Sequence, residues 1–324
     1  MNVLCRRAVL VASVVVLAAS PGNAGPAPAA QRLTLMLDWY PNPNHAAVVA
    51  AKGRGDFAAL GLDVVIQAPA DPSDPLKLAA AGRVDVAISY QPSATIARSE
   101  GVPIAAFGVM VDRPLNTVMT IETSGVRRIA DLKGRRVGYS VPGFEEALLG
   151  AVLASAGLSL GDVTLTNVNF NLTPALLTGQ VAAVVGAYKN YEKFALEQEG
   201  ATVRIFELTD HGVPPYDELV FVASDATLER RSSALRAFLE GVQRGIRRVR
   251  EKPADALAAL HAAYPDTRND LNRRAFEATR TLFARRLAPD PARWEAFQRF
   301  LLERKVIARA SPVAALARTD LAPR

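Results

Sequence analysis

The sequence has one cysteine in 324 residues, Cys5, close to the N-terminus. Arg6 and Arg7 follow it, then an uncharged apolar run over residues 8–19 and a small-residue stretch that ends near Ala24. This order predicts a secretory signal peptide over residues 1–24 and a periplasmic mature protein. The mature chain would contain no thiol. That excludes disulfides, thiol catalysis, cysteine metal sites and lipid attachment to a new N-terminal cysteine.

Long apolar segments are also missing. Residues 8–19 form too short a run for a good membrane span, and no later stretch approaches the required length. A retained interfacial anchor is the alternative to a cleaved signal peptide.

Charge of one sign is in modest excess. The formal net charge is +6, and removal of Arg6 and Arg7 leaves +6 − 2 = +4. Much of this excess falls late in the chain, where arginines alternate with apolar residues as on a solvated helix face. Such a face suits docking on an acidic partner, whereas no motif indicates nucleic-acid binding. The arginines concerned are Arg244, Arg247, Arg248, Arg250, Arg273, Arg274, Arg285 and Arg286.

The usual catalytic motifs are absent from the sequence. Its three histidines lack the spacing of a metal site, and there is no phosphate-binding P-loop and no Gly-x-Ser-x-Gly. Glu145 and Glu146 are adjacent, so on a helix they point in different directions. We interpret them as favourable charge in a first helical turn. The sequence therefore predicts no catalytic group, no metal and no cofactor.

Predicted strands and helices alternate in two successive cycles, which indicates an α/β fold with largely parallel sheets. The first cycle occupies residues 31–116 and the second residues 117–222. Residues 223–310 are helical and would return to the first lobe, and residues 311–324 are expected to be loosely held. The apolar segments 117–121 and 219–223 are candidates for two strands that cross between lobes. A single continuous sheet is the competing arrangement.

The most unusual stretch, residues 37–46, reads LDWYPNPNHA. It follows a buried-strand pattern, and its prolines bar a regular continuation. A small-residue helix comes next, which Asn44 could cap. Ligands of open α/β sheets bind beyond the carboxyl ends of strands, so we expect Asp38, Trp39, Asn42 and His45 at a ligand site. The alternative is a turn whose aromatic residues belong to the core.

Other polar and aromatic residues also fall where predicted strands end or begin. They would converge on one cleft if the two lobes faced each other. Flat rings, amides and a few carboxylates suit a flat, nitrogen-containing ring of low net charge. These candidate ligand residues are Tyr90, Asn116, Ser140, Tyr188, Asn190 and Glu192.

Residues 37–46 resemble the signature of bacterial pyrimidine-precursor binding proteins, the formylaminopyrimidine and hydroxymethylpyrimidine receptors of thiamine salvage. Their family also contains the fungal thiamine-pyrimidine synthase. The resemblance continues in KLAAAG at residues 77–82, AISYQP at 87–92, DLKGRRVGYS at 131–140 and AYKNYE at 187–192.

This resemblance implies a two-lobed periplasmic-binding-protein fold of type II, with two crossover strands and a helical C-terminal part. It also implies a cleft lined by Asp38, Trp39, Asn42, Tyr90, Tyr188 and Glu192. The expected function is substrate binding for an ABC importer, as a monomer that delivers a pyrimidine to a membrane permease. Because the fungal enzymes carry a cysteine-rich cluster, synthase activity is not expected. A receptor for another flat aromatic compound such as riboflavin, or a pyrimidine-processing enzyme, remains an alternative.

Overall fold

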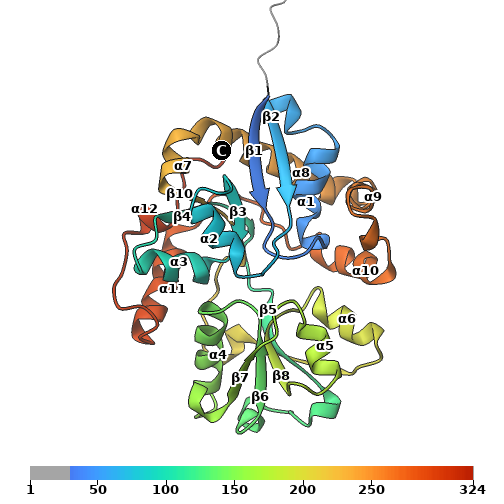
Figure 1. The fold of residues 1–324 in the computed structure, drawn as a ribbon, viewed down its shortest axis with the longest axis vertical. Coiled ribbons are helices and arrows are strands. Elements are labelled where there is room, and N and C mark those ends of the chain that lie inside the picture. The colour runs from blue at the N-terminus through green and yellow to red at the C-terminus, as the bar shows by residue number, and fades with distance from the viewer. Residues whose placement is uncertain (1–29, 324) are drawn as a thin grey trace, which may run out of the picture.

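The computed structural model of the protein describes residues 30–323. In this part of the chain, ten strands form two separate five-stranded sheets, one in each lobe (Figure 1). The first sheet has the order β2-β1-β3-β10-β4 and the second β7-β6-β8-β5-β9. The predicted two-lobed α/β fold is confirmed, and the single continuous sheet is wrong.

Each sheet is parallel except around one strand. The strand that arrives last in the first sheet, β10, is antiparallel to β3 and β4, and β5 is antiparallel to β8 and β9 in the second sheet. The strands of the first sheet are β1 (Gln31–Met36), β2 (Leu62–Gln67), β3 (Val86–Ser89), β4 (Ile104–Val111) and β10 (Leu219–Ser224). Those of the second are β5 (Asn116–Ile121), β6 (Arg136–Tyr139), β7 (Thr164–Asn167), β8 (Ala183–Tyr188) and β9 (Val203–Glu207).

Helices cover the sheets of both lobes. The second lobe carries α4 (Phe144–Ala154), α5 (Leu172–Leu177) and α6 (Glu192–Gln198). The first lobe carries α1 (Ala46–Gly53), α2 (Asp74–Ala80), α3 (Gln91–Ser99), α7 (Asp225–Arg230), α8 (Ser232–Glu251), α9 (Pro253–Ala263), α10 (Asp270–Thr279), α11 (Pro291–Glu303) and α12 (Val313–Leu316).

Small residues let α1, which follows the LDWYPNPNH stretch at residues 37–45, pack closely against α8. A Cβ at Gly245 of α8 would lie 2.0 Å from the carbonyl oxygen of Ala47, so only glycine permits this approach. Ala46, Ala47 and Ala51 are fully buried. The small residues of this segment thus fix α1 against the core.

The chain crosses between the lobes twice, but not in the predicted strands. Segments 117–121 and 219–223 fall within β5 and β10, each of which pairs on both sides within one sheet. The crossings precede them, at residues 112–115 and 212–218, so the second lobe ends before residue 219 rather than at 222. The two apolar strands are buried inside the sheets. The crossings contain Pro114, Pro214 and Pro215, which have no backbone N–H to donate to a neighbouring strand and so favour a segment outside a sheet.

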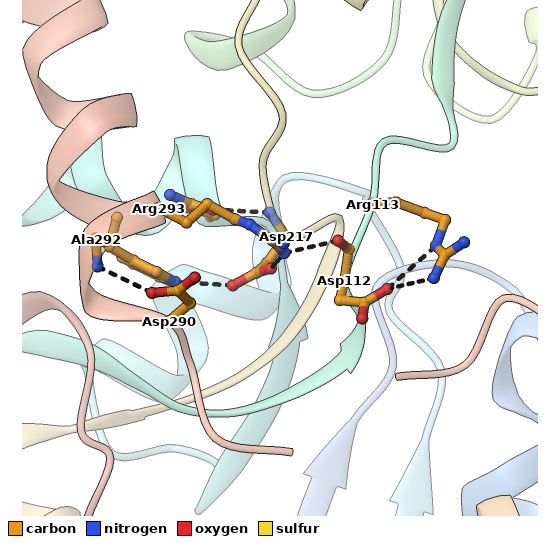
Figure 2. Close-up of polar contacts among 8 residues, drawn as sticks. Asp112, Arg113, Asp217, Asp290, Ala292 and Arg293 are labelled. Carbon is orange, nitrogen blue, oxygen red and sulfur yellow. Dashed lines mark hydrogen bonds and ion pairs between the residues drawn. The ribbon is translucent and has the colours of Figure 1, made fainter. Parts of the chain in front are cut away.

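A C-terminal helix binds both crossings. Arg293 of α11 donates from Nη1 to the carbonyl oxygen of Asp112 at 2.7 Å and to Oδ1 of Asp217 at 2.5 Å (Figure 2). Trp294 is fully buried and donates from Nε1 to Oδ2 of Asp217 at 2.9 Å. Arg293 therefore holds both crossings to the first lobe. It lies 181 residues from Asp112 and 76 residues from Asp217 in the sequence.

The chain end is packed rather than loosely held. Leu316 and Leu321 are buried, and the backbone N–H of Arg318 donates to the carbonyl oxygen of Ala106 in β4 at 2.8 Å. The buried apolar residues of this tail are irregularly spaced, so the sequence has no periodicity that would predict its packing. The predicted signal peptide, residues 1–24, lies outside the described residues. Within residues 30–323, none of the helices combines the length and apolar character needed to cross a bilayer.

Candidate ligand site between the lobes

A pocket lies between the two lobes, where the carboxyl ends of β1 and β3 face those of β6 and β8. It encloses about 400 Å³ of space not occupied by atoms, including its opening to solvent. Six of the predicted residues line it, namely Asp38, Trp39, Asn42, Tyr90, Tyr188 and Glu192. The structure adds Asn44, Phe144, Glu145, Gly186 and Tyr191. His45, Asn116, Ser140 and Asn190 are not among the lining residues.

His45 stands behind the pocket and orients Asp38. The backbone N–H of Asn42 donates to Nδ1 of His45 at 3.2 Å, so the ring proton lies on Nε2, which donates to Oδ1 of Asp38 at 2.9 Å. Tyr90 donates its hydroxyl to the other carboxylate oxygen at 3.2 Å. The predicted ligand contact by His45 is thus replaced by a positioning contact, because both ring nitrogens are engaged and the residue is fully buried.

The predicted cap at Asn44 is also wrong. Asn42 caps the short 3₁₀ turn Pro43–His45 by accepting from the backbone N–H of Asn44 at 2.9 Å. Asn44 instead presents its Oδ1 to Nδ2 of Asn190, from the second lobe, at 2.7 Å. A 3₁₀ turn capped by Asn42 precedes α1, so the Asn44 side chain is not used as a cap and makes a contact between lobes.

Aromatic rings from both lobes meet at the pocket. Tyr90 stacks on Phe144 with centroids 4.8 Å apart and an interplanar angle of 29°. Trp39 meets Phe170 edge to face at 4.7 Å, and Tyr40 meets Tyr191 at 6.0 Å. Each pair joins one residue of the first lobe to one of the second, so flat apolar surfaces are brought together only when the lobes meet.

Glu145 is a pocket residue that the sequence interpretation missed. It is only 3% exposed, and its Oε2 accepts from the backbone N–H of Ser140 at 2.7 Å. A Cβ on Gly186 would lie only 2.4 Å from Oε1 of Glu145. Gly186 also has a φ of +98°, which residues other than glycine rarely adopt. Ser140 therefore acts through its backbone on this carboxyl group, while its hydroxyl donates to the carbonyl oxygen of Asn169. Glycine at position 186 is what makes room for the glutamate.

Burial favours the neutral form of two pocket carboxyl groups. It raises the pKa of Glu145 well above the ordinary glutamate value, and that of Glu192 to about 7. Glu192 is 6% exposed and accepts from the backbone N–H of Tyr188 at 2.8 Å. Groups poised in this way can donate as well as accept a hydrogen bond.

Asn116 and Asn190 support the pocket from outside it. Asn116 is fully buried and accepts from the backbone N–H of Gly186 at 2.8 Å, which ties the start of β5 to the end of β8. Asn190 donates from Nδ2 to Asn44 and to Oγ1 of Thr279 in α10. Both predicted residues thus lie beside the pocket-lining residues, and each side chain bonds a protein partner.

The pocket carries acidic groups without a compensating cation. Within the part of the chain that the structure describes, its lining includes Asp38, Glu145 and Glu192 but no lysine or arginine. Over residues 30–323, no group of three or more histidine, cysteine or acidic side chains could hold a metal ion. The geometry suits a flat ring that carries hydrogen-bond donors and no negative charge.

The fold is that of periplasmic binding proteins. The periplasmic aliphatic sulphonate binding protein SsuA from Escherichia coli superposes with a TM-score of 0.69 at 16% identity, over 90% of this chain and 98% of that chain. The alkanesulfonate-binding protein SsuA from Xanthomonas axonopodis pv. citri, bound to MOPS, gives 0.69 at 18% identity over 89% and 98%. Identities this low relate the folds alone.

The chain belongs to the NMT1/THI5-like family, whose model matches residues 42–256. It is 41% identical to a putative thiamine biosynthesis protein of Haemophilus influenzae over 88% of this chain and 91% of the relative. It is 38% identical to the formylaminopyrimidine-binding protein of Halalkalibacterium halodurans over 72% and 70%. A 4-amino-5-hydroxymethyl-2-methylpyrimidine phosphate synthase of Legionella pneumophila is 28% identical over 85% and 87%. The suspected family is confirmed.

Proposed function

We propose that this protein binds a pyrimidine precursor of thiamine, formylaminopyrimidine or hydroxymethylpyrimidine, between its lobes and delivers it to an ABC importer. The observation that carries the proposal is a pocket of aromatic rings and buried carboxyl groups whose lining, within residues 30–323, contains no lysine or arginine. Similarity to a formylaminopyrimidine-binding protein over 72% of the chain supports the same ligand class.

The carboxyl groups match the edge of an aminopyrimidine. Such a ring presents an amino donor beside a ring-nitrogen acceptor. Because Oε2 of Glu145 accepts from the backbone N–H of Ser140, Oε1 is left for the ligand, and a protonated carboxyl group would donate from Oε1 to the ring nitrogen. Glu192 can accept from an amino group, since only its Oε2 is used by Tyr188. An anionic ligand would meet repulsion from Asp38 instead.

Binding would be coupled to closure of the lobes. The ring would contact residues of both lobes, so it stabilises the closed state by contacts that the open state lacks. Closed lobes would present a joint surface to the permease. The apolar run of residues 8–19 supports export to the periplasm, where such a partner is reached.

A binding role without a catalytic step is favoured over a synthase role. The relatives at 28% identity include a pyrimidine phosphate synthase, which keeps an enzyme as the second candidate. Against it, the only cysteine of the sequence is Cys5, within the predicted signal peptide, so the cysteine-rich cluster of the fungal synthases has no counterpart in residues 25–324.

Thermal shift and calorimetry against hydroxymethylpyrimidine, formylaminopyrimidine, thiamine, riboflavin and an alkanesulfonate test the proposal. A binder gains stability according to ligand concentration over Kd, and the pyrimidine is recovered intact at one per chain. Consumption of the pyrimidine would identify the enzyme. Stabilisation by riboflavin or the sulfonate alone would contradict the ligand assignment.

A further inference from the structure

Helix α10 is the part of the C-terminal region that reaches the other lobe. In Figure 1 it lies at the edge of the first lobe that faces α6 of the second, and it also contacts the 3₁₀ turn Pro43–His45 of the ligand motif. Its residues, Asp270–Thr279, lie beyond residues 42–256 that the family model matches. The α10 side of this contact between lobes therefore lies outside the residues that the family model matches.

One half of the contact is a buried hydrogen-bond junction. Asn190 donates from Nδ2 to Oδ1 of Asn44 at 2.7 Å and to Oγ1 of Thr279 at 2.8 Å. All three residues are at most 3% exposed. Asn190 belongs to the loop between β8 and α6, which carries the pocket residue Tyr191 and directly follows Tyr188, the last residue of β8. The junction therefore anchors the ligand loop of the second lobe on the first lobe.

The other half is an ion pair beside a ring. Arg274 of α10 donates from Nη2 to Oε2 of Glu197 in α6 at 2.7 Å, with side chains 33% and 30% exposed. Its guanidinium carbon lies 4.8 Å from the ring centroid of Phe194. The sequence pattern placed both Arg273 and Arg274 on a solvated helix face. Arg273 pairs with Asp270 of its own helix, as expected there, whereas Arg274 pairs with Glu197 of the second lobe.

We infer that Arg274 and Thr279 are positioning residues for ligand binding, acting through the loop of residues 188–192 and not by touching the ligand. The contacts of both residues join the two lobes, so they stabilise the closed state and are lost when the lobes separate. They raise ligand affinity by holding Tyr188, Tyr191 and Glu192 in place. This inference rests on the proposed function, because it assumes a ligand held between closed lobes.

Arg274→Ala is compared with Arg273→Ala, a matched change of one arginine on the same helix with the same loss of charge. Calorimetry with hydroxymethylpyrimidine or formylaminopyrimidine should show affinity weakened roughly three- to tenfold by Arg274→Ala and unchanged by Arg273→Ala. The difference should shrink at about 1 M salt, which screens the ion pair. Thr279→Val removes the buried acceptor at nearly constant shape and should weaken affinity independently of salt.

A second readout does not depend on the ligand. In a Cys5→Ser background, spin labels at Arg54→Cys and Glu199→Cys report the separation of the lobes. Arg274→Ala and Thr279→Val should lengthen the ligand-free distances, and Arg273→Ala should not. If no pyrimidine binds but Arg274→Ala and Thr279→Val lengthen the ligand-free distances, the proposed ligand is rejected and the role of the two residues in holding the lobes together stands. Equal affinities and equal distances for Arg274→Ala and Arg273→Ala overturn that role.

Discussion

Glu218 accepts a hydrogen bond at Oε2 from the backbone N–H of Leu115 at 2.7 Å, so the end of one crossing is held by the end of the other. The same oxygen accepts from the backbone N–H of Asn116 at 2.9 Å, and Oε1 accepts from the hydroxyl of Tyr188 at 3.3 Å. Tyr188 also lines the pocket. A single fully buried carboxyl group thus joins the ligand site to both segments that link the lobes.

Glu218 should make stability depend on pH. Burial raises its pKa from 4.5 to about 7, so the folded chain holds the proton more tightly than the unfolded chain. Its contribution is fully present below about pH 4.5 and is lost as pH rises through 7, on the order of 3 kcal/mol. Glu218→Gln should reduce this fall in the free energy of unfolding between pH 4.5 and 8.

Urea denaturation across that range measures the effect, with the exposed Glu229→Gln as the control. Glu192, whose pKa is also about 7, contributes with the same sign and remains in both variants. A Glu218→Gln profile parallel to that of the unsubstituted protein would show that Glu218 is ionised throughout.

Trp39 should report the ligand by fluorescence. It is 9% exposed and lines the pocket, while Trp294, the other tryptophan, is fully buried and bonded to Asp217. Ligand should therefore quench or shift the emission, and Trp39→Ala should remove most of the change. The same substitution should weaken binding by about 1–3 kcal/mol through lost ring contact. Quenching should survive in Trp294→Phe, and wild-type affinity in Trp39→Ala would deny the ring a binding role.

Glu192→Gln should discriminate among ligands. Because Oε2 accepts from the Tyr188 N–H, the glutamine oxygen keeps that bond and its NH₂ group faces the pocket. A ligand amino group would then meet a donor, at a cost of about 1–3 kcal/mol. Analogues without the amino group should bind as before. Calorimetry with matched analogues decides this, and equal losses for all of them would deny Glu192 the recognition of an amino group.

Gly186→Ala should damage the pocket more than the fold. The new Cβ would lie 2.4 Å from Oε1 of Glu145 at a φ of +98°, which costs about 1–3 kcal/mol and displaces the carboxyl group. Ligand binding should be lost while the chain still folds. Gly150→Ala is the control, since its Cβ would have its nearest contact at 3.6 Å from Leu160. Normal affinity in Gly186→Ala would mean that Glu145 does not contact the ligand.

The sequence by itself determined the α/β class, the two lobes, the family and six pocket residues. The family followed from the resemblance of residues 37–46 and the other motifs, whereas the α/β class and the two lobes followed from strand–helix alternation, which sets the direction of each chain segment. The carboxyl ends of parallel strands meet at one edge of a sheet, which brings Asp38 and Tyr90 together in the first lobe, and Tyr188 joins them from the facing edge of the second sheet. The apolar pattern also predicts strands at residues 117–121 and 219–223. In the structure these strands are members of the two sheets and do not cross between the lobes.

Only the tertiary structure decided which polar side chains face the pocket. Glu145 points inward because Gly186, from another strand, leaves it space, and His45 is turned away because Asp38 and Asn42 occupy both of its ring nitrogens. Asn190 is taken up by α10, almost ninety residues further along the chain. Local pattern records burial and chain direction, whereas the orientation of a side chain depends on partners that packing brings from distant segments.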